Sequence, residues 1–188
     1  MRIRRINDIP TIWHNIEPFI PALKMIGAKR DEQKRKYAST QNWAKGSTHS
    51  LGLVGELILT LETGISFDSV LRTSGDPGYD IDYANITYDA KTVTHPSPDI
   101  KEMPDRVKRS MRYILIATEE MKRAKVIGWA TREQLEASPL TDYDHGPMRS
   151  IPWYELREFG QLGMPPELPN DTHKGAIEAQ KLLLTLAI

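Results

Sequence analysis

Three charged residues near the middle of the chain have the types and spacing of a site for a divalent cation. The run Gly78–Thr92 predicts a β-hairpin with a two-residue loop at Ala84-Asn85, and this register sets Asp80 opposite Asp89. Opposed like charges destabilise a sheet, so a positive charge must compensate them. A divalent cation such as Mg²⁺ or Mn²⁺ does so directly, because hard cations bind carboxylate and carbonyl oxygens. Lys91 follows Asp89 on the same face and supplies a second positive charge.

Side chains alternate along a strand, so this hairpin has two chemically different faces. The apolar face carries Ile81, Tyr83, Ile86, Tyr88 and Ala90, and the polar face carries Asp80, Asp82, Thr87, Asp89 and Lys91. One alternative is that the polar face is only the solvated surface of an edge hairpin. A one-residue shift in the turn would change the pairing, yet it would keep Asp80 with Asp82 and Asp89 with Lys91.

The segment before the hairpin predicts a helix with one isolated carboxylate. Ser50–Glu62 is apolar on most sides, with Gly64 as its stop, and Glu56 lies roughly opposite the centre of the apolar stripe. A polar residue on such a helix either reaches solvent or faces a site. Gly52 and Gly55 each cost about 1 kcal/mol relative to Ala in a helix, which suggests close backbone packing there.

The remaining pattern indicates an α/β (α+β) protein with a central mixed β-sheet flanked by helices. A capping box at Thr131–Gln134 predicts a helix after the strands. The expected helices are Asp31–Lys45, one near Pro152 and one from about Thr172, and the expected strands are 66–72, Tyr113–Ala117 and Val126–Ala130. Residues 95–105 are expected to form a polar connection.

Composition excludes several classes of protein. The 188 residues contain no Cys, which removes disulfide scaffolds, thiolate zinc sites and iron–sulfur clusters. The net charge of zero excludes a wholly basic nucleic-acid module, but residues 1–50 carry 10 basic and 4 acidic side chains, whereas residues 51–100 carry 2 and 8. This asymmetry suits an acidic metal site beside a surface that binds a polyanion. Without a long apolar run, we expect no membrane partner and a cytoplasmic location.

Other catalytic motifs are missing from the sequence. The five His residues have no metal-ligand spacing, and there is no phosphate-binding Gly-rich loop, nucleophile elbow or dinucleotide fingerprint. These absences argue against zinc hydrolases, nucleotide triphosphatases, α/β-hydrolases and dinucleotide-dependent enzymes.

In order along the chain, Gly55-Glu56 on a helix, Gly78-Tyr79-Asp80 on a strand and Asp89-Ala90-Lys91 on the next strand resemble the PD-(D/E)xK nuclease superfamily. The resemblance covers about residues 48–95 and extends less specifically to 111–138. It implies a restriction-endonuclease-like fold and a Mg²⁺ or Mn²⁺ cofactor. It also implies that Asp80, Asp89 and the Ala90 carbonyl bind the metal, that Glu56 completes the metal shell, and that Lys91 orients or activates the attacking water.

This resemblance suggests three regions and a substrate. We expect a basic N-terminal helical arm at 1–46, a nuclease-like core at 47–162, and a linker with a C-terminal helix at 163–188. DNA is the expected partner, with RNA left open and a homodimer possible through the apolar C-terminal segment. The expected phosphate contacts are Arg4, Arg5, Lys34, Arg35, Lys36, Lys108 and Arg109.

The leading functional prediction is a metal-dependent endonuclease that hydrolyses DNA phosphodiester bonds. A Holliday-junction resolvase is a sub-case of this activity. A non-catalytic nucleic-acid-binding or assembly protein on the same fold is the alternative.

Overall fold

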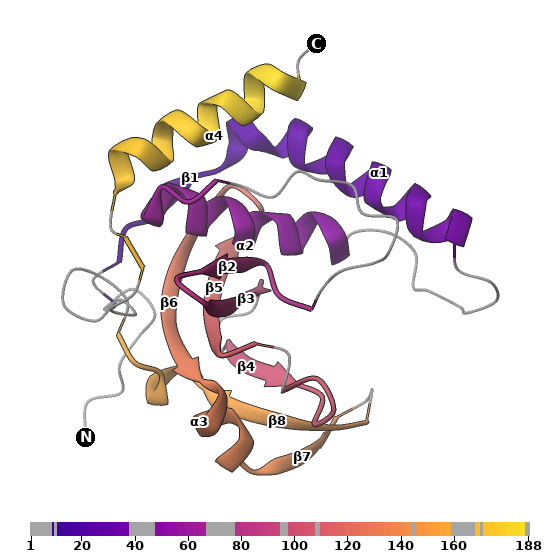
Figure 1. Cartoon of the computed structure of the whole chain (residues 1–188), viewed down its shortest axis with the longest axis vertical. Helices are drawn as coiled ribbons and strands as arrows, with labels where there is room; N and C mark the ends of the chain where they lie inside the picture. Colours follow the sequence, from indigo (N-terminus) through magenta and orange to yellow (C-terminus); the bar gives the residue numbers. More distant parts are fainter. Residues whose placement is uncertain are drawn as a thin grey trace.

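The chain folds into layers of helix and sheet in the computed structural model shown in Figure 1. The structure describes residues 9, 11–37, 48–66, 78–94, 98–107, 110–143, 146–158, 168–169 and 171–186. The helices are α1 (Ile20–Tyr37), α2 (Thr48–Thr63), α3 (Arg132–Ala137) and α4 (Thr172–Leu186), with short 3-10 turns η2 (Glu17–Phe19) and η4 (Trp153–Glu155). The strands are β1 (His14–Asn15), β2 (Ile81–Tyr83), β3 (Ile86–Val93), β4 (Asp99–Glu102), β5 (Arg112–Glu119), β6 (Arg123–Thr131), β7 (Leu140–Tyr143) and β8 (Gly146–Pro152).

Two sheets organise the described part of the chain. A curled, mixed sheet of five strands has the order β1-β6-β5-β3-β2, in which β3 and β5 are parallel and the other neighbours are antiparallel. A second, antiparallel sheet has the order β4-β8-β7. The predicted mixed α/β architecture is confirmed, and the second sheet is an addition to it.

The five-stranded sheet separates two hydrophobic cores. Figure 1 shows α2 between this sheet and the pair α1 and α4, with the small sheet and α3 on the other side. Along β5, Ile114 and Ile116 pack into the core on the α2 side, whereas Tyr113 and Leu115 pack into the opposite core. Each face of β5 is buried, which explains the continuous apolar run in its sequence.

Helix α2 matches its prediction closely. It ends where Gly64 adopts a positive φ of 70° and donates its N–H to the Thr60 carbonyl at 2.9 Å, a helix-terminating geometry that favours glycine. A β-carbon on Gly55 would lie 2.5 Å from the Thr92 hydroxyl oxygen, so the absence of a side chain lets α2 approach β3. Close packing is therefore confirmed at Gly55 and is wrong for Gly52, where a β-carbon would meet nothing within 4 Å.

The hairpin also has the predicted register. Ile81 pairs with Tyr88, Asp82 with Thr87 and Tyr83 with Ile86. The loop residues Ala84 and Asn85 both have positive φ, 51° and 63°, which is the conformation of a tight hairpin turn that follows the natural twist of the strands. The predicted apolar face is confirmed for Ile81, Tyr88 and Ala90, which are buried in the core against α2, whereas Tyr83 is 38% exposed.

Several predicted elements differ from the structure. Helix α1 (Ile20–Tyr37) begins earlier than the predicted Asp31–Lys45 helix and contains its first part, while residues 38–45 lie outside the described residues. Pro21 is compatible with the first turn, where a missing N–H costs nothing. The region near Pro152 is the end of β8 followed by a single 3-10 turn. The supposed polar connection 95–105 contains β4. The strand expected at 66–72 lies, apart from Ser66, outside the described residues.

The capping box at the start of α3 is confirmed. The Thr131 hydroxyl accepts the N–H of Gln134 at 3.3 Å, and the Gln134 side chain accepts the N–H of Thr131 at 3.0 Å. The two bonds satisfy donors that the start of a helix leaves without partners.

Candidate functional site

Asp80 lies where β2 separates from β3. Its backbone N–H donates to the Tyr88 carbonyl at 2.8 Å, although Tyr88 already faces Ile81 in the ladder. Asp80 and Ile81 thus both lie opposite Tyr88, as in a β-bulge. The predicted direct opposition of Asp80 and Asp89 is therefore wrong. The Asp80 carboxylate instead accepts the N–H of Ala90 at 2.6 Å. It replaces the backbone acceptor that β2 would have offered at this edge of β3.

On β3, the residues Asp89 and Lys91 are brought together. The Lys91 ammonium lies 2.8 Å from Asp89 Oδ2. In the parallel pairing, Asp89 faces Tyr113 and Lys91 faces Leu115, so both project from the face of β3 that lies away from α2. Asp80, Asp89 and Lys91 therefore gather around one short stretch of backbone centred on Ala90.

Glu102, on β4, is a member of this cluster that sequence reasoning missed. Its Oε2 lies 2.6 Å from the Lys91 ammonium, and its Oε1 accepts the N–H of Met103 at 2.9 Å. On β4, Ile100 and Glu102 are buried while Lys101 between them is exposed. This alternation was the available signal, but a carboxylate at an inward position of a short strand is read from sequence as a surface residue.

The electrostatics of the cluster keep Lys91 charged. Burial acts to lower the pKa of Lys91, but the negative charges of Asp89 and Glu102 outweigh it, and the net pKa lies above the usual value for lysine. The pKa of Tyr113 is raised to about 12, chiefly by burial and then by the charges of Asp89 and Glu102. The Tyr113 hydroxyl, which donates to the Val107 carbonyl at 2.6 Å, is thus neutral at physiological pH.

Glu56 belongs to a different set of contacts. It is buried on α2 and binds the Arg30 guanidinium of α1 through both oxygens, at 2.8 and 3.3 Å. Helix α2 covers the face of β3 that carries Ala90 and Thr92, whereas Lys91 projects from the other face. The contacts of the described residues therefore join Glu56 to α1 and do not join it to Lys91.

The acidic side chains do not form a ready-made metal centre in the part of the chain that the structure describes. Within those ranges, no group of three or more His, Asp or Glu side chains is placed to hold a metal ion. The Asp80 carboxylate lies close to Asp89, because it contacts the backbone of Ala90, the next residue. Asp82 is exposed.

Comparison of the chain with protein-family models, curated proteins and solved structures found no match. The candidate site therefore has to be judged from its own geometry. In the described ranges, no helix has both the length and the apolar character needed to cross a lipid bilayer.

The predicted phosphate contacts are placed only in part. Lys34, Arg35 and Lys36 lie on α1, in the half that follows Arg30. Arg4, Arg5, Lys108 and Arg109 lie outside the described residues.

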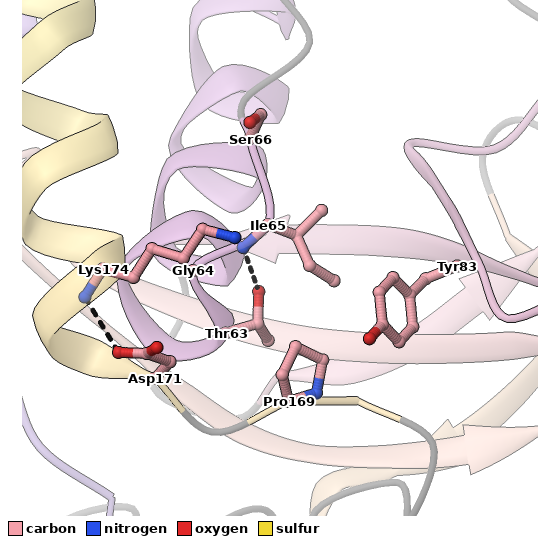
Figure 2. Close-up of a pocket in the computed structure, with 8 residues that line it drawn as sticks. All are labelled: Thr63, Gly64, Ile65, Ser66, Tyr83, Pro169, Asp171 and Lys174. Atoms are coloured by element: carbon pink, nitrogen blue, oxygen red, sulfur yellow. Dashed lines mark hydrogen bonds between the residues drawn. The ribbon is translucent and has the colours of Figure 1, made fainter.

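A surface pocket of about 290 Å³ lies away from this cluster, at the end of α2 and the start of α4. Figure 2 shows Tyr83 on one side of it and Lys174 with Asp171 on the other. The Asp171 carboxylate accepts the N–H of Lys174 at 2.9 Å, and the Thr63 hydroxyl accepts the N–H of Ile65 at 3.2 Å. These side chains stabilise helix ends, and none of the predicted catalytic residues lines the pocket.

Proposed function

We propose that this protein is a metal-dependent nuclease that hydrolyses DNA phosphodiester bonds, acting as an endonuclease. The observation that carries the proposal is the gathering of Asp80, Asp89 and Lys91 around Ala90 at the point where β2 and β3 separate. The order of these residues along the chain, and the mixed sheet on which they lie, are what the resemblance to PD-(D/E)xK nucleases and their restriction-endonuclease-like fold would require.

The donor set suits a hard divalent cation. Mg²⁺ is commonly bound through one or two carboxylates, with water and substrate phosphate completing its shell. Asp80, Asp89 and the Ala90 carbonyl would supply oxygen ligands of this kind. When bound, Mg²⁺ or Mn²⁺ would stabilise charge on the phosphoryl group and lower the pKa of a coordinated water.

Lys91 and Asp89 would assist the hydrolysis itself. Hydrolysis forms a bond between a water oxygen and phosphorus and breaks a phosphorus–oxygen ester bond, while the water proton leaves and the departing oxygen gains one. The charged Lys91 would orient the water and donate hydrogen bonds to phosphoryl oxygens, where negative charge grows in the transition state. Asp89, 2.8 Å from the Lys91 ammonium, keeps that donor next to the proposed metal ligands.

The role of Glu56 stays a prediction. The resemblance implies that it completes the metal shell directly or through water. For this, its carboxylate would have to share or exchange its contact with Arg30. We likewise propose the DNA contacts, the choice of DNA over RNA and a homodimer through the C-terminal helix.

Cleavage assays with purified protein test the function. We expect linear duplex, single-stranded or four-way-junction DNA to be cut with Mg²⁺ or Mn²⁺ and left intact with EDTA, the preferred substrate separating a general endonuclease from a junction resolvase. Lys91→Met should lower cleavage by at least about 100-fold. Lys122→Met is the matched control, because Lys122 pairs with Glu120 on the exposed β5–β6 turn. Full cleavage by Lys91→Met would overturn the site.

Two observations favour the second candidate, a non-catalytic nucleic-acid-binding or assembly protein. The described carboxylates include no three-ligand group, and Glu56 is bound by Arg30. This candidate predicts salt-dependent binding of nucleic acid without cleavage under any divalent ion. A titration by calorimetry that detects no Mg²⁺ or Mn²⁺ binding, together with retained DNA binding, would favour it over the nuclease.

A further inference from the structure

Glu102 occupies a position where an apolar residue would be expected. It is buried on the inward side of β4, next to Ile100, which is fully buried in the core between the two sheets. A buried carboxylate carries a desolvation penalty of several kcal/mol unless it is paired, so its partner should explain its presence. That partner is Lys91, at 2.6 Å.

The Lys91 ammonium is held from two directions. Asp89 contacts it from the same strand, β3, and Glu102 contacts it from β4 in the other sheet. An ammonium has three donor hydrogens on a flexible four-carbon stem, and one contact leaves its position loosely defined. Two carboxylates at 2.6 and 2.8 Å fix both its place and its direction.

We propose that Glu102 is the positioning residue of the site: it holds the Lys91 ammonium at the face of β3 that lies away from α2 when Asp89 binds the metal ion. The inference rests on the proposed nuclease function, in which Asp89 is a metal ligand. Once an Asp89 oxygen is drawn to a cation, its hold on Lys91 weakens, because the cation competes for the same negative charge. Glu102 then keeps the ammonium from turning away, and its own backbone contact at Met103 keeps the carboxylate oriented.

Glu102→Gln is the first test, because it keeps the size and an acceptor oxygen but removes the charge. We expect kcat for DNA cleavage to fall by about 10-fold or more with KM little changed, as for other residues that orient a catalytic group. In a Lys91→Met background, Glu102→Gln should have no further effect on cleavage. Glu102→Asp, which keeps the charge on a shorter stem, should recover part of the rate.

A readout independent of cleavage is the NMR signal of the Lys91 ammonium, assigned by its loss in Lys91→Met. Held in hydrogen bonds, its protons exchange slowly with water and give a ¹H–¹⁵N correlation. We expect this correlation in the wild type and its loss in Glu102→Gln. Glu120→Gln, in the exposed pair with Lys122, is the control and should leave both cleavage and the Lys91 signal unchanged.

The outcomes separate the two proposals. An unchanged Lys91 signal in Glu102→Gln, or a lost signal with an unchanged kcat, overturns the role of Glu102. A wild type that cuts no nucleic acid overturns the proposed function, while the Lys91 signal still decides whether Glu102 holds the ammonium. If Glu102→Gln does not fold, as judged by its thermal unfolding, Glu102→Asp takes its place. A weakened Lys91 signal together with a lowered kcat would then support the proposal, and a wild-type signal or a wild-type kcat would overturn it.

Discussion

The Asp80 carboxylate accepts the backbone N–H of Ala90 at 2.6 Å, at the point where strand β2 stops pairing with β3. A charged acceptor on an edge N–H makes a stronger hydrogen bond than a neutral one. We therefore expect Asp80→Ala to lower the free energy of unfolding by about 2 kcal/mol, measured by urea denaturation. Asp80→Asn keeps an acceptor and should cost less. Asp82→Ala, at an exposed position of β2 in the same hairpin, should stay within about 0.5 kcal/mol of the wild type; an equal loss there would contradict a specific role for Asp80.

The Arg30–Glu56 pair should contribute to stability whatever Glu56 does in catalysis. The side chain of Glu56 is 9% exposed, so Arg30→Ala would leave a largely buried carboxylate without its bidentate partner. We expect a loss of about 3 kcal/mol in the free energy of unfolding. The double variant Arg30→Met/Glu56→Leu, which removes both charges, should regain much of it. A double variant as unstable as Arg30→Ala would show that packing, and not the stranded charge, sets the cost.

Two helical glycines should respond oppositely to alanine. A β-carbon on Gly175 of α4 would lie 2.4 Å from the carbonyl oxygens of Thr60 and Leu61, which belong to the backbone of α2 and cannot rotate away. Gly175→Ala should therefore lower the melting temperature, by an amount equivalent to about 1–3 kcal/mol. Gly52→Ala meets nothing within 4 Å and should raise it by up to about 1 kcal/mol, because Ala is the better helix former. Stabilisation by both would mean that α4 does not cross α2 this closely.

Tyr113 should make stability fall at alkaline pH. Its pKa is about 12 in the folded protein, raised mainly by burial from the ordinary value of 10.0. The folded state then holds a proton that the unfolded state has lost, so this stabilisation is complete below pH 10 and is lost as the pH rises towards 12. The expected loss is on the order of 2 kcal/mol. Urea denaturation across this range should show a shallower fall for Tyr113→Phe, and phenolate absorbance should lose its latest-titrating component.

The sequence predicts those parts of the fold that are determined by residues close together along the chain. The alternation of Ile81, Tyr83, Ile86 and Tyr88 favours the register in which these side chains share one face over a register shifted by one residue, and the favoured register is confirmed. The capping box at Thr131 is equally local. In contrast, β4 has only four residues, of which three are charged, and it is a strand because β8 pairs with it.

The same distinction applies to the contacts of the candidate site. The proximity of Asp89 and Lys91 follows from their spacing along one strand, and it is confirmed. Two other contacts depend on how the strands pack: the bulge turns Asp80 onto Ala90, and the second sheet brings Glu102 to Lys91. The contact of Arg30 with Glu56 is likewise not predicted, because the helix that carries Arg30 begins at Ile20, before the expected start at Asp31.

The connection between β3 and β5 has a consequence for the folding pathway. These neighbours are parallel, so no tight turn can join them, and the chain leaves the sheet and passes through β4 before returning. Pairing across such a crossover is delayed, because its closure entropy must be met before any strand contact compensates for it. The bond between Lys91 and Glu102 closes a much shorter loop within the crossover, and short loops close at lower entropic cost. We therefore expect the contact between Lys91 and Glu102, once formed, to shorten the loop that remains to be closed before β5 pairs with β3.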